Sequence, residues 1–237
     1  MRKFLFILIL LTNLSLEASG PVAHVYLAKR FFRHFPSRFS ETEQTDFLIG
    51  TLFPDIRYTS KLDRHETHYE KMTLEEVLTA DSPFVAGVKF HSYVDLVRDQ
   101  YIRKHRPAVH KAELETDHFS TYIKLLEDEV LFYAGNWSEC ADSLKYIHPE
   151  ESKWEIDQSA LKKWHSLLSL CLQHPPSKVL LLLSISNSSF FGASPELITE
   201  WRRLIPPTAK TEEMKYHVES MIDHFEKEMG KLSGDAV

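Results

Sequence analysis

His91 and Asp95 are the two side chains whose types and spacing best suit chemistry at a metal ion. Four residues apart on a helix, an imidazole and a carboxylate lie on one face and can share a divalent ion. The alternative is an ordinary hydrogen bond between the two groups on an amphipathic helix. The pair by itself leaves both interpretations open.

Three more potential ligands precede this pair, and each follows or interrupts an apolar stretch of the chain: His24, Asp55 and His68. Zinc binds histidine nitrogen and carboxylate oxygen, and a catalytic zinc ion keeps one position open for water. The five groups together are enough for one or two ions.

The order and surroundings of these residues resemble the zinc-dependent phospholipase C family. Its members combine an early histidine, a Gly-x-x-x-Pro-Asp segment, an Arg-x-x-x-His or Thr-His segment, and a Gly-x-x-x-His-x-x-x-Asp helix. In this chain the matching positions are His24, then Gly50 to Asp55, then Arg64 with Thr67-His68, then Gly87 to Asp95. The match covers roughly residues 21–120. Secreted bacterial members add a further histidine and a His-x-x-x-Glu pair, and neither occurs here at the expected spacing.

The resemblance implies that His24, Asp55, His68, His91 and Asp95 bind a cluster of two or three zinc ions. It also implies hydrolysis of a phosphodiester by zinc-activated water. We expect His68, His91 and Asp95 to hold one ion, while His24 reaches a second ion that shares Asp95. Asp55 is expected to be a ligand or the catalytic proton acceptor. The implied substrate is a glycerophospholipid, cleaved on the glycerol side to leave diacylglycerol. In the resembling enzymes the N-terminal residue also helps to bind metal.

A second acidic region follows the helix that carries His91. Pro107 favours the first turn of a new helix, so we expect the chain to fold back near Arg106. Residues equally far from the turn would then face each other, which brings acidic groups beside Asp95. A second metal site and a solvated acidic helix face both remain open. The weaker candidate ligands are His65, which competes with His68, and Asp99, His110, Glu113 and Asp117.

The apolar spacing of the chain is mostly helical. Apolar residues recur three and four positions apart over 22–35, 43–52, 73–80, 84–105, 108–133, 158–173, 195–204 and 212–229. The apolar run 178–185 suits a short core helix better than a buried strand, because leucine dominates it. Only seven glycines occur, and no Asn-Gly or Asp-Gly hairpin turn is present. These features predict an all-α, single-domain multi-helix bundle with the metal site between helices.

The N-terminus has the layout of a secretory signal peptide: a basic start, the apolar run 4–11, and small or polar residues up to Gly20. We assign residues 1–20 to this segment, and cleavage after Ala18 satisfies the need for a small residue. An uncleaved anchor is the alternative. The protein is therefore expected to be secreted or periplasmic, with residues 21–237 as one domain.

Charge and cysteine content limit the partners. A formal net charge of −6 argues against nucleic acid, which needs a basic face. We expect a phospholipid or another phosphodiester as substrate, with possible contact to a membrane surface. Cys140 and Cys171 could form one disulfide after export. Because no Cys-x-x-Cys pattern exists, a thiolate zinc site is excluded.

Two alternatives to a phospholipase C-like hydrolase remain open. One is a phosphodiesterase that acts on another substrate. The other is a non-catalytic secreted helical protein that binds metal for structure or docks a partner, as the missing family ligands suggest. Metal content separates these hypotheses: several zinc ions with an open position indicate a hydrolase, whereas one closed site indicates a structural role.

Overall fold

The computed structural model describes residues 19–105, 118–185 and 193–234. Within these ranges the secondary structure is helical and no β-sheet forms, so the predicted all-α class is confirmed. The α-helices are α1 (Pro21–His34), α2 (Glu41–Leu52), α3 (Arg64–Thr67), α4 (Leu74–Leu78), α5 (Pro83–Lys104), α6 (Phe119–Phe132), α7 (Ser138–Ser143), α8 (Gln158–Gln173), α9 (Pro176–Ile185), α10 (Pro195–Ala209) and α11 (Glu212–Ser233). Two 3-10 helices, η1 (Pro54–Tyr58) and η2 (Pro149–Trp154), complete the described elements.

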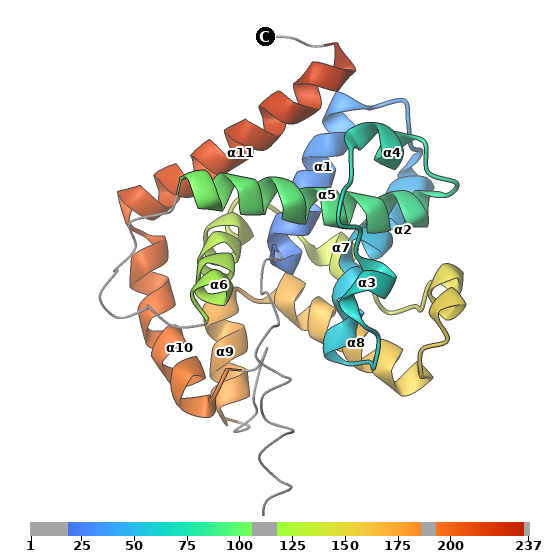
Figure 1. The fold of residues 1–237 in the computed structure, drawn as a ribbon. Coiled ribbons are helices and arrows are strands. Elements are labelled where there is room, and N and C mark those ends of the chain that lie inside the picture. Colours follow the sequence, from blue (N-terminus) through green and yellow to red (C-terminus); the bar gives the residue numbers. More distant parts are fainter. Residues whose placement is uncertain (1–18, 106–117, 186–192, 235–237) are drawn as a thin grey trace, which may run out of the picture.

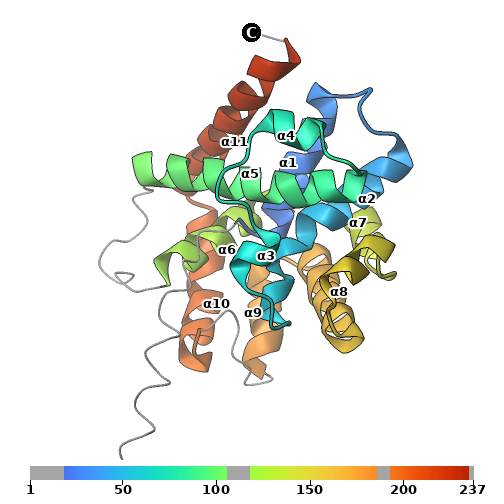
Figure 2. The same cartoon turned by 45° about the vertical axis from the view of Figure 1, so that its right-hand side comes forward.

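Helix α1 lies at the centre of the bundle and contacts α2, α5, α6, α8 and α11 (Figure 1). The long helix α5 crosses the body and packs closely on α2. Helices α6, α9 and α10 form one flank, while α7 and α8 pack together on the other (Figure 2). The N-terminal segments that carry the predicted ligands therefore meet inside the bundle, where α1 and α5 pack together.

Local sequence signals explain where the site-forming helices begin. Pro21 occupies the first turn of α1, where its missing N–H costs nothing. The two following N–H groups of α1, from Val22 and Ala23, donate to the buried carboxylate of Asp128 on α6 at 3.2 and 2.9 Å. Ser82 caps α5 by accepting from the N–H of Val85. Helix α1 is thus anchored to α6 through its N-terminus.

Two glycines allow α2 and α5 to cross at close range. A Cβ atom at Gly50 would collide with the carbonyl oxygen of Phe84, and one at Gly87 would collide with that of Phe47. Only glycine, with no side chain, permits this approach of two backbones. The crossing brings the end of α2 against the middle of α5, where His91 lies.

The observed boundaries agree with most predicted helices, and the clearest difference lies in α10. Helix α10 continues through Pro206 and Pro207, although the apolar pattern predicted its end at 204. Burial of the following Thr208 and Ala209 accompanies this extension. The run 178–185 belongs to helix α9 and is not a strand. Helix α6 begins at Phe119, and the predicted helical stretch 108–117 lies outside the described residues.

The pattern missed the short elements α3, α7, η1 and η2, because a single turn holds too few residues to show a period. Cys140 and Cys171 are both free thiols in the structure, so the disulfide that export would permit is not formed. No helix among the described residues combines the length and hydropathy that a bilayer span requires.

Candidate metal centre

His91 lies in the middle of α5 with 1% of its surface exposed. Its Nδ1 atom is 2.9 Å from the carbonyl oxygen of Thr51 at the end of α2. A carbonyl can only accept, so Nδ1 carries the hydrogen and donates it. The lone pair of Nε2 therefore points away from α2, into the space between α1, α5 and the α3 segment.

His68 is held in the same tautomer by a different device. The hydroxyl of Thr67 donates to the carbonyl oxygen of Pro54 at 2.9 Å, so its oxygen accepts from Nδ1 of His68 at 3.0 Å. Nε2 of His68 is then left without a hydrogen and lies 3.1 Å from Nε2 of His91. Two nitrogen lone pairs at this distance repel each other unless a proton or a metal ion lies between them.

Carboxylates surround the two nitrogens. One oxygen of Asp95, Oδ2, lies 3.3 Å from Nε2 of His91 and 3.8 Å from Nε2 of His68. The other, Oδ1, lies 3.4 Å from Nε2 of His24. Asp55 approaches from η1, with Oδ1 3.7 Å from Nε2 of His68. Asp95 thus faces both sides of the cluster with different oxygens.

The structure brings together all five residues that were predicted to bind metal. They form two groups whose ligand atoms lie within 4.8 Å of one another: His24, His91 and Asp95, and Asp55, His68 and His91. We call these five residues the cluster. His91 belongs to both groups, but its Nδ1 is engaged, so its one remaining lone pair can bind a single ion. Of two ions, one would therefore have to be held without His91.

The weaker candidates do not join the cluster. His65 is exposed, and Oδ2 of Asp99 pairs with Nε of Arg103 at 2.6 Å. Both residues line an open cleft next to the cluster. His65 lies on the outer side of α3, which resolves its competition with His68. The candidates His110, Glu113 and Asp117 lie outside the described residues, as does the predicted turn near Arg106.

Burial and charge set the protonation of the cluster. Burial, reinforced by His91, lowers the pKa of His24 to about 4 and that of His68 to about 3. Burial alone would also lower the pKa of His91, but the carboxylates of Asp95 and Asp55 outweigh it and raise that pKa. Although burial disfavours charge, His91 and other cations hold the pKa of Asp55 and Asp95 below the ordinary value. The imidazoles of His24 and His68 are therefore neutral near pH 7, beside the two carboxylates.

This donor set fits zinc. Both ring nitrogens of His24 and Oδ1 of Asp55 are buried, yet none makes a regular hydrogen bond with a described residue. Such orphaned atoms are costly unless a bound ion or water satisfies them. Hydrogen bonds to Nδ1 of His68 and His91 are the supporting contacts typical of zinc-binding histidines.

Three contributors to the site were missed by the sequence argument. The backbone nitrogen of Ser19 donates to Oδ1 of Asp95 at 2.8 Å. Lys124 of α6 is 2% exposed and lines a small inner cavity together with His24 and Asp55. Thr51 supplies only a carbonyl, which no side-chain pattern reveals. A lysine inside the apolar stretch 122–126 was the one available signal.

An open cleft of about 630 Å³ leads from solvent to the cluster. His68 and Asp95 form its floor, and Arg64, Tyr69 and Asp99 contribute to its walls. Nη2 of Arg64 lies 3.5 Å from Oδ2 of Asp95, and one-third of the Arg64 side chain is exposed. The cleft has the size of a small-molecule binding site.

Fold and cluster together define an all-α protein with a candidate metal centre between α1, α5 and the α3 segment. No protein-family model matches the chain, and neither curated proteins nor solved structures give a match. The link to phospholipases C therefore rests on the motif residues and on their convergence in space.

Replacing Thr67 by valine tests the support of His68. Valine keeps the shape of threonine but removes the oxygen that fixes Nδ1. We expect zinc affinity to fall by roughly 10- to 100-fold, the usual cost of losing such a supporting contact. Competition with a chelating dye measures the effect. The control is Thr45→Val on α2, whose hydroxyl bonds only to its own helix; equal affinity in both variants would contradict this role of Thr67.

Acid is expected to destabilise the zinc-free protein. Because the pKa values of His24 and His68 lie below 6.5 in the folded state, the unfolded chain binds more protons as the pH falls from about 6.5 to 5. Their contribution to stability is complete above 6.5 and is lost toward lower pH, by roughly 1.4 kcal/mol per pH unit for each histidine. The raised pKa of His91 stabilises the folded protein, and this stabilisation is fully present below pH 6.5. It therefore does not change between pH 6.5 and pH 5.

Thermal unfolding in chelator at pH 7, 6 and 5 measures this loss. The variant His24→Ala should show a shallower slope, because one of the two titrating groups is gone. A melting temperature that does not depend on pH in this range would show that the histidines are not held neutral.

Proposed function

We propose that this protein is a zinc-dependent phosphodiester hydrolase of the phospholipase C type. One observation carries the proposal: Nε2 of His68 and Nε2 of His91 lie 3.1 Å apart with both Nδ1 atoms engaged, beside two buried carboxylates. That arrangement is suited to a cation. Its ligand types and their order along the chain support zinc and the resemblance to this family.

The cleft supports a phosphoester as substrate. Arg64 is placed between solvent and Asp95, and its buried Nη1 makes no hydrogen bond with a described residue. A guanidinium offers two parallel donors that match the oxygens of a phosphate. We assign Arg64 the binding of a non-bridging phosphate oxygen at the floor of the cleft, next to the cluster.

The residues of the cluster would bind the metal ions and accept the proton of the attacking water. When bound, zinc supplies Lewis acidity and lowers the pKa of a coordinated water to about 7. His68, His91 and Asp95 would hold the ion nearest the cleft, and His24 with the second oxygen of Asp95 would hold another. Asp55, whose pKa stays low against the effect of burial, is ionised and can ligate or accept the proton of the attacking water.

Ser19 makes one further contribution to the proposal. Its backbone nitrogen donates to Asp95 from a buried position, and its hydroxyl oxygen is also buried. Cleavage after Ala18 would turn this nitrogen into the α-amino group of the mature chain, beside His24 and Asp95. The amine could then ligate zinc, as the family resemblance implies.

The length of the N-terminus should therefore matter. We expect a chain that begins at Ser19 to bind zinc about tenfold more tightly than one that begins at Ala18, a difference of about 1.4 kcal/mol. The free amine of Ser19 can offer a lone pair to the metal, whereas the amide nitrogen of Ser19 in the longer chain cannot. Isothermal titration of the two purified chains makes the comparison. Equal affinities would place the amine outside the metal centre.

The first test of the proposal is the zinc content of the purified protein together with hydrolysis of two substrates. Phosphatidylcholine vesicles and bis-nitrophenyl phosphate separate a phospholipase from a phosphodiesterase with other substrates. Bound zinc and chelator-sensitive cleavage of either substrate would support a hydrolase. No metal binding after zinc is resupplied would rule the mechanism out.

A structural metal site is the second candidate, and deep burial favours it. The five cluster residues are only 1–8% exposed, as in closed sites that stabilise a fold. Bound zinc that raises the melting temperature without any cleavage of the two substrates would support this alternative.

A further inference from the structure

Besides Arg57, whose Nε lies 3.5 Å from Oδ1 of Asp55, a second buried cation borders the cluster: Lys124. The residue lies on α6, and its side chain borders a small cavity lined by His24, Asp55 and His91. This cavity shares no lining residue with the cleft that holds Arg64. Only 2% of Lys124 is exposed, which is exceptional for a lysine.

Lys124 interacts electrostatically with the carboxylates of the site. Its charge interacts favourably with Asp55 and Asp95, and also with Asp128 one turn further along α6. Burial lowers the pKa of Lys124, and these three carboxylates oppose that shift. Its ammonium also lies 5.9 Å from the ring of Tyr58. Glu127, the other buried acid of this turn, is engaged elsewhere by Arg98 and His217.

We propose that Lys124 is a built-in cation of the candidate metal centre, which takes a position a divalent ion would otherwise fill and so limits how many ions the cluster holds and how tightly. The inference rests on the proposed function and specifies its metal content. Asp55 and Asp95 bring two negative charges, and Arg57 and Arg64 already approach these carboxylates at 3.5 Å. Lys124 adds a further buried positive charge, so each zinc ion would enter a site that already holds cations.

A second zinc ion would add two more positive charges in a site remote from water. Repulsion between charges a few ångströms apart is strong there, because little solvent screens it. His91 has only one lone pair available, so it can bind only one ion. This also limits the number of ions that the cluster can hold. Wild-type protein is therefore expected to bind one ion tightly and any further ion weakly.

Replacing Lys124 by methionine tests the inference, since methionine keeps most of the volume and removes the charge. We expect zinc to bind at least ~10-fold more tightly, or one additional ion to bind per chain. In chelator the same variant should melt at a lower temperature, because the carboxylates lose their cation. Opposite changes in zinc affinity and zinc-free stability distinguish a charge from a side chain that only packs.

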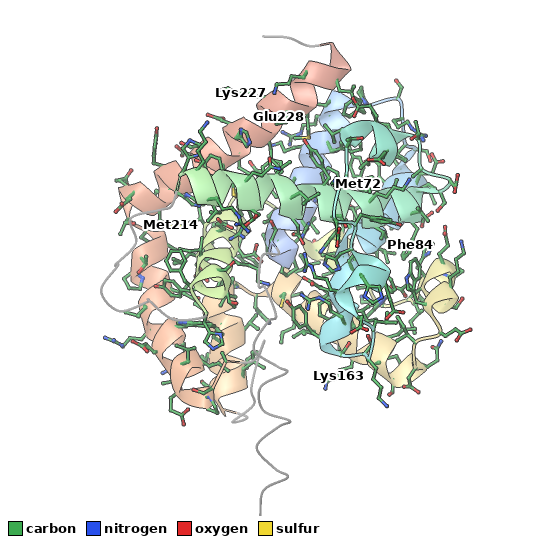
Figure 3. All side chains as sticks on the ribbon, in the orientation of Figure 1. Met72, Phe84, Lys163, Met214, Lys227 and Glu228 are labelled. Carbon is green, nitrogen blue, oxygen red and sulfur yellow. The ribbon has the colours of Figure 1, made fainter. Side chains whose placement is uncertain are left out.

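Two variants serve as controls. Lys163→Met removes the same charge from the exposed face of α8 (Figure 3) and should leave zinc binding and melting unchanged. Lys124→Gln replaces the charge by a neutral polar group and repeats the test if the methionine variant does not fold in chelator. Zinc affinity is measured by titration, and the number of ions by elemental analysis.

The outcomes separate the inference from the proposed function. Zinc bound by the wild type, with the same affinity and number in both Lys124 variants, overturns the role of Lys124 and leaves the hydrolase intact. Zinc bound only by the variants supports the role of Lys124 and overturns the proposal of a zinc enzyme. No zinc in any chain overturns both.

Discussion

Replacing His91 by alanine is expected to remove zinc from the cluster altogether. His91 belongs to both groups of ligands, and its Nε2 is the one nitrogen that all the others surround. Loss of a mere supporting contact costs about 10- to 100-fold in metal affinity or activity, so loss of this ligand should cost more than ~100-fold in both. Elemental analysis and the rate of phosphodiester cleavage measure the two effects.

The control for this variant is His65→Ala, in the same cleft but outside the cluster. It should retain the zinc content of the wild type. His24→Ala and Asp55→Ala each remove a ligand from one group only, and we expect intermediate losses of zinc. Full zinc content in His91→Ala would refute the cluster as a metal centre.

Replacing Glu127 by alanine should cause the largest loss of stability. Glu127 is fully buried and accepts from Nε of Arg98 at 2.6 Å and from Nε2 of His217 at 3.0 Å. These contacts tie α6 to α5 and α11. Alanine would leave Arg98 buried beside a vacated partner, which costs about 3–5 kcal/mol. For a chain of this size the melting temperature should fall by roughly 6–20 °C.

Denaturant unfolding of the wild type and the variant gives the change in free energy of unfolding. Asp142→Ala is the matched control, because its ion pair with Lys145 on α7 and the following turn is largely exposed. No measurable change is expected there. An equally small change for Glu127→Ala would mean that the buried network does not hold the three helices together.

The positions of the candidate metal ligands could be predicted in part because some of them rest on local rules. Spacing of four on a helix placed His91 beside Asp95, and the apolar period placed α5 within a residue of its observed ends. Bringing His24 and Asp55 to the same point is a matter of tertiary packing. That convergence was inferred from family resemblance, and the structure now provides its geometry.

The parts that sequence could not predict depend on the backbone or on long-range contacts. The carbonyl of Thr51 and the N–H of Ser19 carry no side-chain signature. Lys124 looks like a surface lysine until α6 is packed against α1. Asp128 likewise seems one acid among several, yet it caps α1; burial raises its pKa to about 7 against the N–H groups of Val22 and Ala23.

The glycine crossing of α2 and α5 also implies an order of events during folding. Before the helices dock, Nδ1 of His91 has no carbonyl of Thr51 to bind, and its hydrogen can reside on either ring nitrogen. In a partly folded chain, His91 is therefore not yet fixed in one tautomer. Gly50 and Gly87, which permit the close approach of α2 and α5, therefore also allow the contact that fixes His91 in the tautomer with Nε2 unprotonated.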